Sequence, residues 1–135
     1  MIHEITLMEA YLIEALKNSD ASHSKIISYV RQKEADQMQR VAQSDSDFTL
    51  LYELEGQLED ILRDGYRVKF LTFPGLQRLL LLQVEKEADL DYTLNGFTVE
   101  GLSLTTEEAE KVETFLSKNW TFTKTGETYT IQPTR

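Results

Sequence analysis

The sequence feature that most constrains the fold is a run of four leucines, Leu79–Leu82, within the stretch PGLQRLLLLQVEKE. The run is far shorter than the roughly 18 apolar residues that a membrane-spanning helix needs. Leucine favours helix, the run does not alternate as a half-buried strand does, and Pro74 suits the first turn of a helix. We therefore predict a helix from about Pro74 to Glu87, capped at Thr72. The alternative is a hairpin that turns at the Pro-Gly pair and returns as a strand.

The leucine helix also poses a question of burial. Four successive leucines extend over more than one turn, so the centre of the helix is apolar nearly all round and needs cover on more than one side. Because closed two-fold dimers are the commonest oligomers, we predict a homodimer at micromolar concentration with its contact near Leu76–Val84. Full burial in the core and a different protein partner are the alternatives.

The pattern before this helix is mainly helical. Thr6 and Glu9 form a capping-box pattern that opens a first helix. A second helix with a thin apolar stripe is predicted from about residue 22 to 42. A third follows the N-cap candidates at 45–47, carries leucine and isoleucine at helical spacing, and ends at Gly65.

The remaining sequence mixes strand and helix signals. Residues 66–73 alternate as a strand does, and Asn95-Gly96 is a strong hairpin signal. Thr105 with Glu108 forms a second capping box before a helix. A last hairpin turns at Thr125-Gly126. One of its faces is predicted to hold four large residues: Trp120, Phe122, Tyr129 and Ile131.

These elements predict a single α+β domain over residues 1–135. Residues 1–65 would form an N-terminal helical layer of about three helices. Residues 66–135 would form a small, mostly antiparallel sheet with two further helices.

Composition narrows the classes of function. The absence of cysteine excludes disulfides and thiolate chemistry. The first helix is interrupted by glutamates and lacks a basic leader, which indicates a cytoplasmic protein without a signal peptide or membrane contact. The net charge of −9 disfavours direct binding to nucleic acid or to anionic lipid.

No motif for catalysis stands out. His3 and His23 are the available imidazoles, but His3 lies near the terminus and His23 among helix-cap serines. The glycines are scattered at turns and form no phosphate loop. We assign no catalytic residue, cofactor or metal ligand, and we favour a non-enzymatic role while leaving enzymatic activity open.

Acidic residues at helical spacing are candidate metal ligands. Glu55 pairs with Glu59 one turn later, and Glu107, Glu110 and Glu113 recur at intervals of three. Both sets lie away from the apolar stripe of their helix. We therefore interpret them as solvated faces.

The uneven distribution of charge is the most informative surface feature. Residues 66–84 contain three basic residues and no acid, whereas residues 85–113 contain nine acids and two lysines. An internal pairing of the basic and acidic stretches is one interpretation, and a basic partner protein is the other. The candidate partner-binding residues form one acidic tract: Glu85, Glu87, Asp89 and Asp91.

The sequence thus predicts a small acidic protein that acts by protein–protein interaction, as an adaptor, inhibitor or regulator of bacterial or phage-like style. The alternatives are a metal-dependent hydrolase that uses helical carboxylates and an acidic mimic of nucleic acid. The mimic would need its acids in phosphate-like rows, and only residues 85–113 come near such a pattern.

Overall fold

The computed structural model describes residues 2–134 and confirms the α+β class. The chain forms two compact units, Met1–Tyr66 and Arg67–Arg135. Helices precede the sheet as predicted, although two short strands, β1 (His3–Ile5) and β2 (Tyr66–Val68), come earlier. Within residues 2–134, no helix combines the length and the hydropathy needed to span a bilayer.

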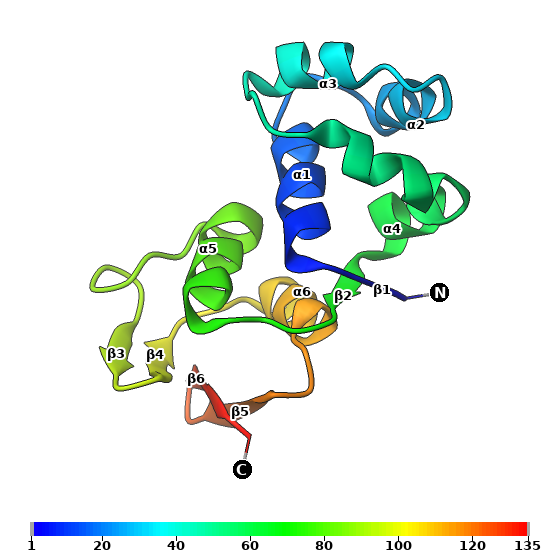
Figure 1. Ribbon diagram of the computed structural model, residues 1–135. Coiled ribbons are helices and arrows are strands. Elements are labelled where there is room, and N and C mark those ends of the chain that lie inside the picture. The colour runs from blue at the N-terminus through cyan, green and yellow to red at the C-terminus, as the bar shows by residue number, and fades with distance from the viewer. Residues whose placement is uncertain (1, 135) are drawn as a thin grey trace. The chain divides into compact units, whose positions relative to one another are not determined.

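The first unit is built mainly from helices (Figure 1). α1 begins with the predicted capping box: the Thr6 hydroxyl accepts the Glu9 N–H at 3.1 Å, and the Glu9 carboxylate accepts the Thr6 N–H at 2.8 Å. Both bonds satisfy N–H groups that a helix start leaves free. The helices are α1 (Leu7–Lys17), α2 (His23–Arg31), α3 (Ala35–Ala42), the 3₁₀ helix η1 (Phe48–Gln57) and α4 (Leu58–Asp64).

The prediction of one continuous second helix was wrong, because α2 and α3 are separate. Lys33 adopts a left-handed φ of 56°. Its N–H donates to the Val30 carbonyl, and the next N–H donates to the Tyr29 carbonyl, which is the Schellman pattern of a helix end. The Tyr52 hydroxyl of η1 then accepts the Ala35 N–H at 3.0 Å and satisfies a donor at the start of α3.

The third predicted helix is present but begins with a different geometry. Asp47 is its N-cap, and the Asp47 carboxylate accepts the Thr49 N–H at 3.1 Å. The first ten residues are 3₁₀, and α-helical geometry starts at Leu58. Gly65, with φ of 85°, ends α4 as predicted.

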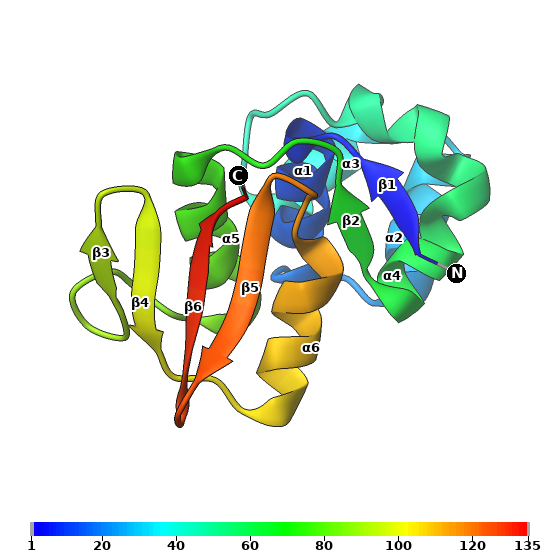
Figure 2. The same ribbon diagram turned by 90° about the horizontal axis from the view of Figure 1, so that it is seen from below.

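The second unit places two helices on one face of a four-stranded antiparallel sheet (Figures 1 and 2). The strand order is β3-β4-β6-β5. Both predicted hairpins are confirmed, and Phe122 pairs with Ile131 on the large-residue face. The elements are α5 (Phe73–Val84), β3 (Thr93–Asn95), β4 (Thr98–Leu102), α6 (Thr106–Phe115), β5 (Trp120–Thr125) and β6 (Thr128–Pro133).

The leucine run lies in α5, so the predicted helix is confirmed over the hairpin. The Thr72 hydroxyl caps it by accepting the Gly75 N–H at 3.1 Å. The helix ends at Val84, three residues earlier than predicted, because Glu85 takes a left-handed φ of 58°. Leu80 is fully buried whereas Leu81 is 42% exposed, so the helix is not covered all round.

The strand predicted over 66–73 is shorter than expected and stops at Val68. Beyond it, side chains satisfy the backbone of Leu71. The Ser117 hydroxyl accepts the Leu71 N–H at 3.0 Å, and the Leu71 carbonyl accepts the Trp120 indole N–H at 2.7 Å and the Asn119 amide at 3.0 Å. These bonds replace the ladder that a longer strand would need.

Candidate functional site

The four acidic residues predicted to bind a partner lie in one short loop after α5. We call residues 85–91 the acidic loop. The Asp91 carboxylate accepts the Glu87 N–H at 2.9 Å, and the Glu87 carbonyl accepts the Asp91 N–H at 2.9 Å. Asp91 therefore shapes the loop, while the side chains of Glu85, Glu87 and Asp89 are exposed. Within residues 2–134, no carboxylate of this loop belongs to an ion pair.

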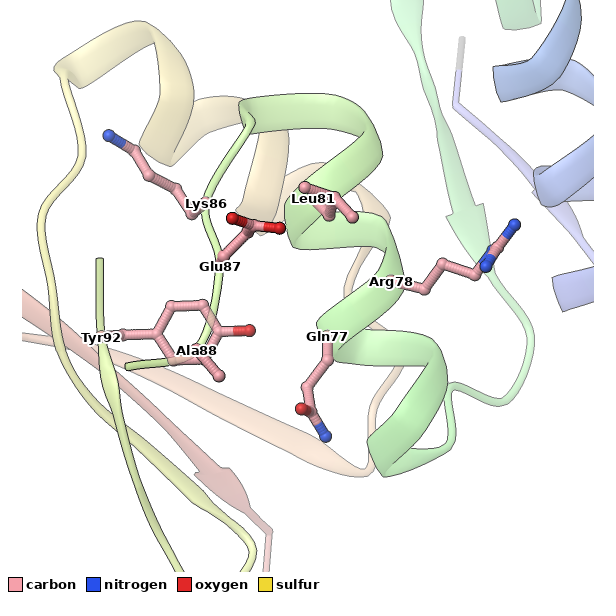
Figure 3. A pocket seen from close by; sticks show the side chains of 7 residues that line it. All are labelled: Gln77, Arg78, Leu81, Lys86, Glu87, Ala88 and Tyr92. Atoms are coloured by element: carbon pink, nitrogen blue, oxygen red, sulfur yellow. The ribbon is translucent and has the colours of Figure 1, made fainter. Parts of the chain in front are cut away.

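A hollow of about 400 Å³ lies between α5 and the acidic loop (Figure 3). Binding sites for small ligands have volumes of about 300–1,000 Å³, so the hollow can accept one large side chain or a small molecule. Its lining combines apolar, amide, phenolic and charged groups: Gln77, Arg78, Leu81, Lys86, Glu87, Ala88 and Tyr92.

Tyr92 closes the loop side of the hollow. The residue is only 4% exposed, and its hydroxyl points toward α5 (Figure 3). No other group in residues 2–134 hydrogen-bonds this hydroxyl. Burial raises the pKa of the Tyr92 phenol, and the charges of Asp91, Glu87 and Asp89 raise it further. The hydroxyl is therefore protonated, lacks a protein partner, and lies in a negative potential.

The charged groups of the two basic lining residues, Lys86 and Arg78, point away from the interior of the hollow (Figure 3). The Lys86 ammonium extends toward α6, where it lies 4.0 Å from a carboxylate oxygen of Glu108. The Arg78 side chain extends away from the acidic loop (Figure 3). The Glu87 carboxylate, in contrast, reaches across the hollow toward Leu81. The interior of the hollow is consequently acidic and apolar.

Two exposed leucines lie in α5 and in the acidic loop, and Leu81 also lines the hollow. Leu81 of α5 is 42% exposed, and Leu90 within the acidic loop is 78% exposed. Single exposed leucines are ordinary, but here two of them accompany a hollow and three exposed carboxylates. This combination of apolar and acidic groups suits a partner that carries both apolar and basic side chains.

The histidines provide no arrangement for nucleophilic catalysis. His3 Nε2 lies 2.8 Å from one carboxylate oxygen of Asp60. The other carboxylate oxygen of Asp60 lies 2.7 Å from the Arg63 guanidinium. The pKa of the Asp60 carboxyl is lowered, first by the hydrogen bond with His3. His23 is exposed at the first position of α2. His3 thus belongs to a charged surface cluster of the first unit.

The helical carboxylates that are candidate metal ligands do not line the hollow beside α5. Glu55 lies on η1 and Glu59 in the first turn of α4, and both are exposed. Glu107, Glu110 and Glu113 are exposed along α6. In the part of the chain that the structure describes, no three acidic, histidine or cysteine residues form a cluster able to hold a metal ion.

Sequence reasoning missed two buried polar groups. In the sequence Tyr92 is one of the apolar residues that alternate with polar ones before Asn95-Gly96, and only its place beside the acidic loop shows that it lines the hollow. Glu14 is 2% exposed in α1, where its carboxylate accepts the Tyr66 hydroxyl at 2.7 Å. The one available signal for Glu14 was its position inside the apolar stretch YLIEAL.

Comparisons with protein families, with characterised proteins and with solved structures gave no significant match.

Proposed function

We propose that this protein is a non-enzymatic binding protein whose acidic loop and adjoining hollow take up a basic segment of another protein. Such a role suits an adaptor, an inhibitor or a regulator, and we assign it to the cytoplasm. The observation that carries the proposal is the hydroxyl of the buried residue Tyr92, which lacks a protein hydrogen-bond partner within residues 2–134 and opens into a hollow that Glu87 and Leu81 also line.

Charge decides which kind of protein fits this site. The chain has 23 acidic and 14 basic residues, and the carboxylates of the acidic loop are free of ion pairs within residues 2–134. A basic segment would be steered toward this potential and would supply the missing counter-charges. The leucines at the border would supply contact area once the charges have oriented the partner.

A second copy of the chain fits less well than a basic partner. The homodimer predicted near Leu76–Val84 stays a prediction, and Leu81 is an exposed apolar residue of that range which it would bury. A two-fold contact brings the same patch of both copies together, so two acidic loops would face each other. Like charges at close range oppose such a contact.

The two other candidate functions draw no support from the site. A metal-dependent hydrolase needs carboxylates that converge, whereas Glu55, Glu59 and the acids of α6 are exposed on separate elements. A nucleic-acid mimic needs rows of acids at phosphate spacing, whereas the acids of residues 85–113 are divided among the acidic loop, β4 and α6.

A pull-down from cell extract at low and high salt tests the proposal. The tested variant combines Glu85→Gln, Glu87→Gln and Asp89→Asn. Asparagine is chosen because residue 89 has a left-handed φ of 68°, which asparagine accepts. We expect a basic protein to be retained by the native chain at low salt, released at high salt, and lost with the triple variant.

A matched control removes the same number of charges elsewhere: Glu55→Gln, Glu110→Gln and Glu113→Gln. These three side chains are exposed and far from the acidic loop in the sequence. Equal loss of the partner with both triple variants would show that only net charge matters, and would contradict a defined site.

A further inference from the structure

We propose that the hollow receives one arginine side chain of the basic partner. This inference rests on the proposed function and deepens it, because it makes the hollow the element that selects among basic segments. It depends on the walls of the hollow, on the two oxygen groups that face it and on the local potential.

The walls match the stem of an arginine. Leu81 of α5 and Ala88 of the loop are apolar, and the ring of Tyr92 lies beside Ala88 (Figure 3). An arginine carries three methylene groups that pack on apolar surface while the charged end seeks polar groups. The volume of about 400 Å³ is large enough for the whole side chain.

The oxygen groups match the charged end. The Glu87 carboxylate enters the hollow from the acidic loop, and the Tyr92 hydroxyl enters it from the residue that follows the loop. Each can accept a hydrogen bond, and a guanidinium has five N–H donors in a planar fork that reaches two separate acceptors at once. An ammonium presents its donors from one point, so lysine would satisfy the pair less well.

Tyr92 is the observation that separates this site from an ordinary acidic surface. The residue is only 4% exposed, yet its hydroxyl has no protein hydrogen-bond partner within residues 2–134 and stays accessible from the hollow. Burial raises the pKa of the phenol most and disfavours any charge, but the carboxylates of Asp91, Glu87 and Asp89 raise it as well, and their negative charges favour a cation beside the ring. With Lys86 directed toward Glu108, an incoming guanidinium meets no opposing charge from that side chain.

Fluorescence anisotropy with three labelled peptides tests the inference. Each peptide has the sequence Gly-Lys-Gly-X-Gly-Lys-Gly, with arginine, lysine or the neutral isostere citrulline at X. We expect the arginine peptide to bind at least about tenfold more tightly than the citrulline peptide, as a hydrogen-bonded charge would. The lysine peptide should lie between the two.

Two variants locate the effect in the hollow. Tyr92→Phe removes only a hydroxyl that lacks a protein partner, so the variant should fold and melt as the native chain does. It should weaken the binding of the arginine peptide about threefold to tenfold and leave the affinity for the citrulline peptide unchanged. Glu87→Gln should also reduce the preference for arginine, whereas the control Glu110→Gln should leave all three affinities unchanged.

The outcomes separate this inference from the proposed function. If the three peptides bind equally and the triple variant of the acidic loop still abolishes binding, the arginine site is refuted and the acidic binding surface stands. If no peptide binds at millimolar concentration, both fail. If N-acetyl-arginine methylamide alone competes as strongly as the peptide, the hollow binds a small cation and the docking of a protein segment is refuted.

Discussion

The pair Leu80 and Leu81 offers a sharp test of the core, because the two residues are adjacent on α5 and differ mainly in burial. Leu80 is 0% exposed and Leu81 is 42% exposed. Truncation to alanine removes three carbons, worth about 2.4 kcal/mol when fully buried at roughly 0.8 kcal/mol per carbon. The cavity left by Leu80→Ala brings its cost to about 2–5 kcal/mol. Leu81→Ala leaves no enclosed cavity and loses just over half of the transfer energy, about 1.4 kcal/mol.

Urea unfolding measures this difference. Trp120 is the only tryptophan of the chain and is buried in the same unit as α5, so its fluorescence reports the unfolding of that unit. We expect a clear loss of the free energy of unfolding for Leu80→Ala and a much smaller loss for Leu81→Ala. Equal costs for the two variants, or a cost for Leu80→Ala below about 0.5 kcal/mol, would refute the assignment of Leu80 to the core.

Three further predictions can be checked by measuring the stability of variants, or of the native chain with added metal ions. Thr105→Ala should cost about 1 kcal/mol, because the Thr105 hydroxyl accepts the Glu108 N–H at 3.1 Å as the N-cap of α6; an unchanged midpoint in urea would contradict this role. The lowered pKa of Asp60, due first to its hydrogen bond with His3, means that the stabilisation is complete above about pH 4 and is lost as pH falls through the folded pKa. Asp60→Asn should therefore flatten the acid side of a plot of melting temperature against pH, and an unchanged acid side would refute the contact. Millimolar Mg²⁺, Mn²⁺ or Ca²⁺ should leave the melting temperature nearly unchanged. A bound ion at 100 times its Kd would raise the free energy of unfolding by about 2.7 kcal/mol, which would be easily seen. A large shift that Glu55→Gln abolishes would support the metal-dependent hydrolase instead.

The local elements of this protein follow from short stretches of sequence. The capping boxes at Thr6 and Thr105, the cap at Thr72 and the hairpin at Asn95-Gly96 all appear where the sequence predicts them. Each depends on hydrogen bonds or backbone angles within about four residues, and such interactions are the same in a peptide and in a fold. Gly65 ends a helix for the same reason.

Tertiary contacts decided where elements stop. The helix predicted over 22–42 breaks near Lys33, with the Tyr52 hydroxyl 17 residues away bonded to the start of α3. The strand predicted over 66–73 ends at Val68, and the Leu71 backbone is bonded by side chains more than 40 residues later. No local pattern contains such partners, so propensity alone extended both elements too far.

One part of the candidate site can be predicted from the sequence, and the other part depends on the tertiary structure. The acidic loop has four acids in seven residues, and such a concentration of charge can be recognised from the sequence without knowing the fold. The hollow depends on how α5 lies against the acidic loop, and the role of Tyr92 depends on the hollow. In an alternating segment a tyrosine reads as an apolar residue, because the sequence shows its hydrophobic ring and its period but not which groups surround its hydroxyl. Only the packed structure buries the ring, turns the hydroxyl to the hollow without a protein partner, and brings three carboxylates near it.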